Sequence, residues 1–424
     1  MSSSAPTPGP GTAPADHAGG SAAPAPTARL WSANFRLYFT ARSVAMLGDT
    51  MLPVALSAGL LSYGYSAGDI GLVMAASTAC FAGFVIFGGV FADRFNARAL
   101  MIGADLVRVC SQSAVAFLFL THTVRLWEIA IVAVINGTAA AMFQPGVAST
   151  VVRVATDVQG ANGVTRTAES VAGLAGPALA GVLVGFTSAG TVFAVHAGTY
   201  LISALCLIAL RLTPLPARTA ASAFRSDLAE GWREFRARTW MWSVIVVWMV
   251  YMVCVVGPYT PLSAGQIIPG HGAGAYGLVN SALGGGTAVG ALVAMRIRAE
   301  RPLRAGSLAL FGTALMPVSV GLDLPVWMMA TGVFVAGAGW AYWGVNWATS
   351  VQTQVPGDIL NRIHAYEVAG SVAMVPVGQA LAGPAASAFG AQRVLQAGGL
   401  VAVAVAAALL AIPAVRDLRR APAA

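Results

Sequence analysis

The most informative property of this sequence is how little charge it carries. Charged residues make up only 9% of the 424 positions, lysine is absent, and 57% of the residues are hydrophobic. The mean hydropathy is +0.73. Soluble globular proteins usually carry about 25% charged residues, and the surface of a soluble protein this size could not be covered with so few. The composition therefore excludes a soluble domain and indicates a membrane protein.

Groups that could perform chemistry are also scarce. The four cysteines (Cys80, Cys110, Cys206 and Cys254) each fall in an apolar run and show no metal-ligand spacing, so we expect buried thiols. The sequence has no phosphate-binding loop of the G-x-x-x-x-G-K-[ST] type, which excludes ATP as the direct energy source. It also has no catalytic cluster of His, Asp or Ser. We expect no enzymatic activity, no cofactor and no metal.

Long apolar runs are abundant. Each is close to the roughly 20 residues that a helix needs to cross about 30 Å of hydrocarbon, and none shows the ten-residue alternation of a membrane barrel. The sequence predicts an all-α integral membrane protein with twelve transmembrane helices in two pseudo-symmetric six-helix bundles. The predicted spans are 37–62, 69–92, 98–120, 127–151, 163–186, 190–212, 240–264, 275–296, 303–321, 325–350, 362–386 and 390–413.

Every basic residue that contributes to the net charge of +8 is an arginine. The loop arginines are distributed unevenly. If the N-terminus lies in the cytoplasm, only Arg125 and Arg393 fall in outer loops. The positive-inside rule therefore predicts that both termini are cytoplasmic. Because the arginines follow the topology, we expect contact with a lipid bilayer and no binding of nucleic acid. The lack of lysine and the wealth of Ala, Gly and Val indicate a high-GC bacterial genome, and hence the bacterial cytoplasmic membrane.

An internal repeat supports a division into halves. Residues 57–73 align without a gap to residues 263–279, with identity at nine of seventeen positions. Parallel repeats of this kind are typical of transporters whose site lies between two halves. The predicted organisation is a disordered cytoplasmic tail (1–28), a first six-helix bundle (29–212), a cytoplasmic linker containing a short amphipathic helix (213–239), a second six-helix bundle (240–413) and a cytoplasmic tail (414–424).

The segment "GGVFADRFNARAL" (Gly88–Leu100) interrupts the apolar sequence between the second and third spans. It resembles the signature loop of the major facilitator superfamily, with Gly89, Asp93, Arg94 and Arg98 in matching positions. Asn96 stands where the second glycine of that motif is usual. The resemblance implies that the acidic residue faces the start of span eleven and that the first arginine joins a charge network closing the cytoplasmic gate. A charged turn that only sets the topology is the alternative.

The resemblance extends over most of the chain. Gly-Asp in span one, Asp-x-x-Arg in span three and Gly-Pro-x-x-x-Gly in span five are similar to the drug:proton antiporter branch, especially its enterobactin-exporter-like and macrolide-efflux-like group. It implies a monomeric efflux antiporter whose partners are protons and an amphipathic small-molecule substrate, such as a drug, an antibiotic (hence antibiotic resistance) or a siderophore-like metabolite. An uptake permease of the same fold and a non-transporting membrane receptor or regulatory protein remain open alternatives.

Ionisable residues inside predicted spans are functional candidates, because burying them in a membrane is costly. Asp49 lies beyond the middle of the first span, where it could couple transport to protons or bond a neighbouring helix. Glu169 and Glu367 occupy nearly equivalent places in the two halves and are further coupling candidates. Pairing with Arg166 and Arg362 in a gate is the alternative for these two glutamates.

A second group of charges lies near the cytoplasmic ends of spans one and three. Asp105 and Arg108 are three residues apart, share one helix face and could pair. Arg42 lies at a similar depth. We predict that these three residues form a structural or gating cluster. His196 is a lone intramembrane histidine, for which a hydrogen-bonded packing role is the expectation.

The segment "GWAYWGVNWATSVQTQ" in span ten concentrates aromatic residues. Trp340, Trp343 and Trp347 follow a spacing that places them on one helix face. In the family that this chain resembles, span ten lines the central cavity, so this face could stack on a planar or cationic ligand. Packing against lipid or protein is the alternative. The predicted polar residues of the cavity are Asn136, Gln144 and Asn346.

Overall fold

The computed structural model describes residues 31–94, 97–155, 157–212, 232–355, 370–371 and 373–420, and no strand occurs among them. The first half consists of α1 (Ala33–Ser62), α2 (Ala67–Arg94), α3 (Ala97–Leu120), α4 (Leu126–Val154), α5 (Val158–Phe186) and α6 (Ala189–Ala209). The second half consists of α8 (Thr239–Tyr251), the π-helical turn η1 (Met252–Val256), α9 (Gly257–Arg296), α10 (Pro302–Leu310), the 3-10 turn η2 (Phe311–Ala314), α11 (Leu315–Gly321), α12 (Val326–Gln354), α14 (Val375–Phe389), α15 (Ala391–Ala411) and α16 (Pro413–Arg416).

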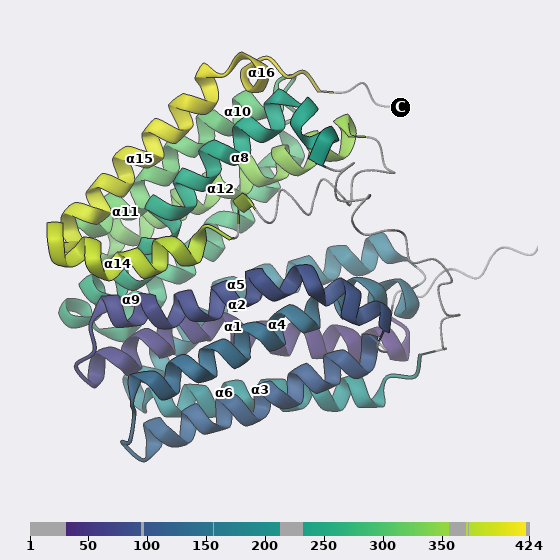
Figure 1. Cartoon of the computed structure of the whole chain (residues 1–424), viewed down its shortest axis with the longest axis vertical. Coiled ribbons are helices and arrows are strands. Elements are labelled where there is room, and N and C mark those ends of the chain that lie inside the picture. The colour runs from purple at the N-terminus through teal and green to yellow at the C-terminus, as the bar shows by residue number, and fades with distance from the viewer. Residues whose placement is uncertain are drawn as a thin grey trace, which may run out of the picture.

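The two halves form two helix bundles (Figure 1). Helix α1 packs between α5 and α6 in the first bundle, and α12 packs against α9 and α10 in the second. The bundles contact each other mainly through α5 with α9 and α2 with α14. They lie together at one end and diverge toward the end at which the C-terminus lies (Figure 1). The arrangement agrees with the expected pair of bundles.

Small residues permit the close approach of the two bundles. A Cβ atom added at Gly181 of α5 would lie 2.7 Å from the carbonyl oxygen of Ala273 and 3.2 Å from the Cα of Gly277, both in α9. On the other side of the boundary, Gly68 of α2 lies directly against Gly383 of α14. Both contacts are near the helix ends that lie far from the termini. The boundary between the bundles is therefore closed there by backbone against backbone.

Side-chain caps determine where several helices begin. The Ser32 hydroxyl accepts a hydrogen bond from the backbone amide of Phe35, Asp157 accepts from the amide of Gly160, and Ser188 accepts from the amide of Thr191. Each cap satisfies one of the backbone donors that the first turn of a helix leaves unpaired. The local sequence thus determines where α1, α5 and α6 begin.

In the described part of the chain, nine helical segments are long and apolar enough to cross a membrane. One of them, Thr239–Arg296, covers two of the predicted spans. The backbone leaves helical geometry at Gly272, where φ is 80°, and the Tyr276 hydroxyl donates a hydrogen bond back to the carbonyl of Thr260. The chain therefore folds back there into two antiparallel helices. The predicted eleventh span is described only from residue 370 onward, so the count of twelve stays a prediction.

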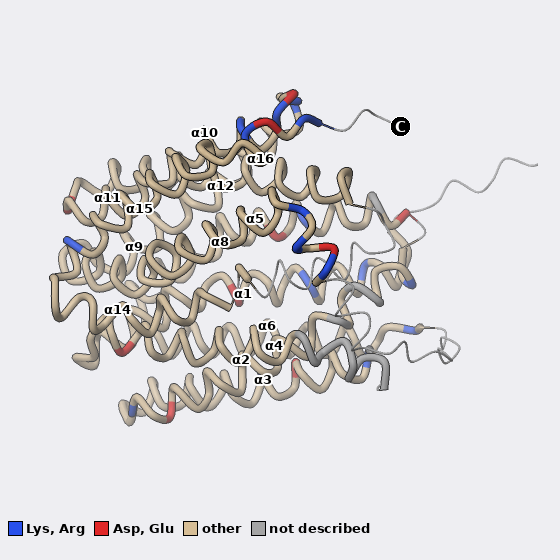
Figure 2. Tube along the Cα trace, turned by 45° about the horizontal axis from the view of Figure 1, so that its top comes forward, with Lys and Arg blue, Asp and Glu red and all other residues tan. Residues whose placement is uncertain are grey.

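Most of the charged residues lie toward the end of the molecule where the C-terminus lies (Figure 2). There the residues after α15 pack against the second bundle: the backbone amide of Arg420 donates to the carbonyl of Glu300, and Arg301 pairs with Asp417 at 3.0 Å. A hydrogen bond from Arg416 lowers the pKa of Asp417, and the charges of Arg301 and Arg304 act in the same direction.

Two of the predicted segments lie outside the description. The tail 1–28 is not described, and the linker 213–239 is described only from residue 232, with residues 232–237 helical. The predicted amphipathic helix of the linker therefore stays a prediction for most of its length.

Candidate functional site

A buried polar cluster occupies the interior of the first bundle, with Asp49 of α1 in contact with α6. The Tyr200 hydroxyl donates a hydrogen bond to Asp49 Oδ1, and His196 Nε2 lies 3.4 Å from the same oxygen. The neighbouring Gly48 leaves room for His196 and Thr199, because a Cβ at that position would overlap both side chains. The Asp49 side chain is 34% exposed and that of His196 is 1% exposed. Asp49 therefore joins the cluster while keeping one accessible side.

Helix α3 contributes a second carboxylate and an arginine to this cluster. Asp105 is fully buried and accepts a hydrogen bond of 2.6 Å from the Ser203 hydroxyl of α6. The Arg108 guanidinium lies 4.9 Å from the centre of the Tyr200 ring and 5.7 Å from that of Phe143. The expected ion pair between Asp105 and Arg108 is not formed, because the guanidinium stacks on aromatic rings of α4 and α6 instead. Arg108 nevertheless interacts electrostatically with both carboxylates, Asp49 and Asp105.

The charge balance of the cluster is uneven. It contains two carboxylates (Asp49 and Asp105), one guanidinium (Arg108) and one imidazole (His196). Asp105 Oδ1, Arg108 Nε and His196 Nδ1 have no hydrogen-bond partner among the described residues. Unbalanced charge is unfavourable in a low-dielectric interior. For the two carboxylates and the guanidinium, a single bound proton brings the formal charge to zero.

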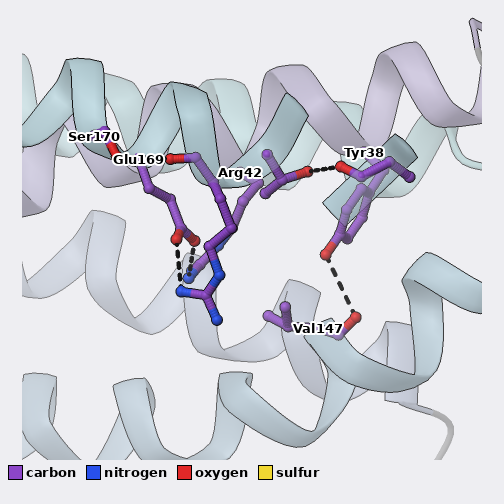
Figure 3. Close-up of polar contacts among 8 residues, drawn as sticks. Tyr38, Arg42, Val147, Glu169 and Ser170 are labelled. Atoms are coloured by element: carbon purple, nitrogen blue, oxygen red, sulfur yellow. Dashed lines mark hydrogen bonds and ion pairs between the residues drawn. The ribbon is translucent and has the colours of Figure 1, made fainter. Parts of the chain in front are cut away.

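A separate ion pair links α1 to α5 (Figure 3). Arg42 Nη2 lies 2.9 Å from Glu169 Oε1, and Arg166 Nη1 lies 3.0 Å from Glu169 Oε2. The Glu169 side chain is 14% exposed, whereas that of Arg166 is 83% exposed. Beside them, the Tyr38 hydroxyl donates to the carbonyl of Val147. Arg42 thus belongs with Glu169 rather than with Asp105 and Arg108, and Glu169 contacts two arginines.

The signature loop is described in part. Arg98 Nε donates a hydrogen bond of 2.8 Å to the carbonyl of Leu207, and its guanidinium also donates to the carbonyl of Ile208. Arg98 thereby satisfies carbonyls in the last turn of α6, where a cation is also favoured by the helix dipole. The side chains of Gly89, Asp93 and Arg94, at the end of α2, lie outside the description. So does Glu367.

A cavity of about 150 Å³ is lined mostly by helices of the first bundle, and no residue of the polar cluster lines it. Its wall is mainly apolar, with Gln112 of α3, Asn136 of α4 and Gln379 of α14 among its polar residues. Gln112 follows Arg108 by four residues, so it lies about one helical turn farther along α3. Gln379 belongs to the second bundle, so both bundles form this wall. We name this space the amide cavity. The structure places the predicted Asn136 here, but Gln144 is exposed and does not line it.

A second cavity of about 400 Å³ lies in the second bundle and is lined by four tryptophans. The predicted Trp340, Trp343 and Trp347 of α12 face it together with Trp248 of α8. Asn346 does not line it: this residue is buried and donates its amide hydrogen to the carbonyl of Tyr342. We name this space the tryptophan cavity.

Several residues of these sites were not among the sequence candidates. Tyr200, Ser203, Gln112 and Gln379 carry no charge, and nothing in their local sequence connects them with Asp49 or Asp105. Trp248 had a weak signal, because the start of the second bundle is also rich in aromatic residues. Within the described ranges, no group of three His, Cys, Asp or Glu side chains is arranged to hold a metal ion.

The sequence profile of the Major Facilitator Superfamily matches residues 38–375. The chain belongs to this superfamily. It is 24% identical to the enterobactin exporter EntS of Shigella flexneri, over 82% of this chain and 84% of that protein. It is 21% identical to macrolide efflux protein A of Streptococcus pyogenes, over 55% of this chain and 58% of that protein. These matches confirm the resemblance found in the sequence.

Solved structures show the same superfamily fold. A bacterial homologue of the human lysosomal transporter Spinster, in an inward-facing and unoccupied conformation, has a TM-score of 0.69 and 16% identity. The match covers 92% of this chain and 98% of that one. Membership in the superfamily makes this protein a multi-pass membrane transporter of small molecules, and not an enzyme.

Proposed function

We propose that this transporter exports an amphipathic small molecule by proton antiport and alternating access. The observation that carries the proposal is the buried cluster of two carboxylates and one arginine, one turn from a cavity whose wall crosses the bundle boundary. The direction is supported by the relatives, which include an enterobactin exporter and a macrolide efflux protein. A drug, an antibiotic or a siderophore-like metabolite is the proposed cargo, and antibiotic resistance is a possible consequence of exporting an antibiotic.

Asp49 is the proposed proton site. It is faced by His196 and Tyr200 from α6 and by the charges of Arg108 and Asp105 from α3. When protonated, Asp49 becomes a hydrogen-bond donor and no longer balances Arg108. The contacts that hold α1 to α6 and α3 then change. Protonation would thus alter the packing of α1, which also contributes Leu52, Pro53 and Leu56 to the amide cavity.

The remaining candidates divide into gate and coupling residues. We assign Asp93, Arg94 and Arg98, with Gly89 permitting close packing, to a gate at the end where the termini lie. Glu367 is a second coupling candidate. Arg42 and Glu169 form a fixed link inside the first bundle, and Asp105 and Arg108 set the charge of the Asp49 cluster.

We place both termini in the cytoplasm of a bacterium, with the protein in the cytoplasmic membrane as a monomer. The gathering of arginine at the terminal end supports this orientation through the positive-inside rule (Figure 2). The bundles then touch at the outer end, and the structure corresponds to the inward-open state of the transport cycle.

The test is transport in proteoliposomes under an imposed pH gradient. The substrates are the fluorescent amphipathic dyes ethidium and rhodamine 6G. We expect gradient-driven flux in the wild type and in Asp323→Asn, a control that changes an exposed carboxylate of the second half. Asp49→Asn should lose the gradient dependence. Gradient-driven flux that persists in Asp49→Asn would overturn the assignment, and dye moving inward in cells would favour an uptake permease.

A further inference from the structure

The amide cavity and the tryptophan cavity approach each other along α14. Val375 lines the tryptophan cavity and Gln379 lines the amide cavity. These residues are four positions apart in α14, and side chains at this spacing lie on the same helix face with Cβ atoms about 5–6 Å apart. One ligand can therefore contact both walls.

The wall of the tryptophan cavity is built from tryptophan rings that pack on one another. The Trp248 and Trp343 rings are stacked at 5.6 Å with an interplanar angle of 22°, and the Trp343 and Trp347 rings lie 6.1 Å apart at 15°. Trp340 adds a tilted ring 5.3 Å from Trp248. The remaining described lining is aliphatic apart from Ser371, and it includes no charged residue. Such a wall favours a flat aromatic group, neutral or with delocalised positive charge.

The amide cavity offers hydrogen-bond acceptors instead. Gln112 is 2% exposed and Gln379 is 8% exposed, and the Oε1 atom of each has no partner among the described residues. Both side chains line the cavity. A buried acceptor without a donor is unfavourable by itself, so a ligand that supplies N–H or O–H groups is favoured here.

We propose that the two cavities are the two halves of one binding site. A planar aromatic group of the substrate stacks in the tryptophan cavity, and an N–H or O–H group of the same molecule binds Gln112 and Gln379. The inference rests on the proposed transport function and narrows its substrate class to aromatic molecules that carry hydrogen-bond donors. Because the site takes its walls from both bundles, such a ligand links them.

The test is equilibrium binding to the full-length protein in detergent, without any gradient. The probe is proflavine, a planar cation with two amino groups. Acridine orange keeps the rings and the ring nitrogen but lacks the amino N–H donors, because dimethylamino groups replace the amino groups. Tetrabutylammonium keeps the positive charge without any ring. We expect proflavine to bind more tightly than acridine orange, and tetrabutylammonium to bind at least tenfold more weakly than proflavine, as the loss of aromatic contacts requires.

Substitutions test the contributions of the tryptophan cavity and the amide cavity separately. Trp343→Leu and Trp340→Leu should weaken proflavine binding roughly tenfold. Trp343→Phe, which keeps a ring, should stay within roughly threefold of the wild type. Trp327→Leu is the matched control, because Trp327 of α12 is 69% exposed and lines neither cavity. Gln379→Leu should remove the preference for proflavine over acridine orange while the variant still binds both.

Three results would overturn the site. They are equal binding of tetrabutylammonium and proflavine, unchanged binding in both Trp343→Leu and Trp340→Leu, and an unchanged preference in Gln379→Leu. Trp340 is only half-buried, so its variant tests the site even if Trp343→Leu fails to fold. Tryptophan-dependent binding without gradient-driven flux would defeat the transport proposal and leave the site intact. Gradient-driven flux that is unchanged in both Trp343→Leu and Trp340→Leu would leave the transport proposal intact and defeat the binding site.

Discussion

The two bundles share an architecture but differ in what their interiors contain. The first bundle buries Asp105, Arg108 and His196 and holds Asp49 and Glu169 in hydrogen bonds and ion pairs. In the described helices of the second bundle, the charged residues stand at the helix ends, and the interior is aromatic around Trp248 and Trp343. Backbone symmetry is therefore not accompanied by chemical symmetry.

The difference indicates a division of roles. Among the described residues, the buried charges lie in the first bundle, and the clustered tryptophan rings lie in the second. Gln379 brings the second bundle into the wall of the amide cavity, which Gln112 of the first bundle also lines. Proton and substrate can then influence each other through the packing between the bundles, without sharing a single side chain.

The largest expected effect comes from removing the only guanidinium of the buried cluster. Arg108→Ala leaves Asp49 and Asp105 without a countercharge, and leaving a buried charge uncompensated typically costs about 3–5 kcal/mol of unfolding free energy. Thermal and denaturant unfolding in detergent measures this cost. Arg36→Ala, at an exposed arginine of α1, should change the unfolding free energy by no more than about 0.5 kcal/mol.

A double variant sharpens this result. Adding Asp105→Asn to Arg108→Ala removes one uncompensated carboxylate, so part of the lost stability should return. If Arg108→Ala has the same unfolding free energy as the wild type, electrostatic interactions do not stabilise the cluster. The proposed difference in role between the two bundle interiors would then be wrong.

The second effect concerns the boundary at which the bundles meet. Gly181→Val places a branched side chain against Ala273 and Gly277, and overpacking of this kind costs about 1–3 kcal/mol. The cost falls on the conformation in which the bundles touch at this end, so dye flux should drop about tenfold. Gly185→Val is the matched control one turn farther along α5, where nothing lies within 4 Å of an added Cβ. Equal flux in the two variants would show that this contact does not matter for transport.

The smallest effect concerns the link between α1 and α5. A double-mutant cycle on Arg42→Met and Glu169→Gln should give a coupling of about 1 kcal/mol, because both side chains are largely shielded from water. The same cycle with Arg166→Met should give about 0.3 kcal/mol, because Arg166 is mostly exposed. Unfolding in detergent measures both cycles. Similar values for Arg42 and Arg166 would contradict a fixed link between the helices.

The sequence predicted the features that depend on local pattern. Apolar runs located most helices to within a few residues: the predicted span 98–120 corresponds to α3, Ala97–Leu120. Asp49 and Asp105 stood out because a carboxylate in an apolar run is rare. The tryptophan spacing in α12 predicted that three rings share one helix face, and these three rings line one cavity. Their role in binding a substrate stays a prediction.

The features that escaped prediction depend on contacts between distant segments. Tyr200 and Ser203 are ordinary residues of an apolar helix until packing brings them against α1 and α3. Arg108 was expected to pair with its neighbour on α3, but the aromatic rings of α4 and α6 offered a better-packed partner. The sequence shows which side chains are costly to bury, but the contacts that stabilise them form only in the folded structure.

The most direct test of alternating access is a pair of distances measured across the bundle boundary. With the native cysteines replaced, spin labels at Arg36 and Arg298 report on the terminal end, and labels at Thr123 and Leu322 report on the opposite end. We expect proflavine or a change in pH to shift the two distance distributions in opposite directions, and Asp49→Asn to abolish the response to pH. Distances that stay constant at both ends under every condition would contradict movement of the bundles and the transport mechanism that depends on it.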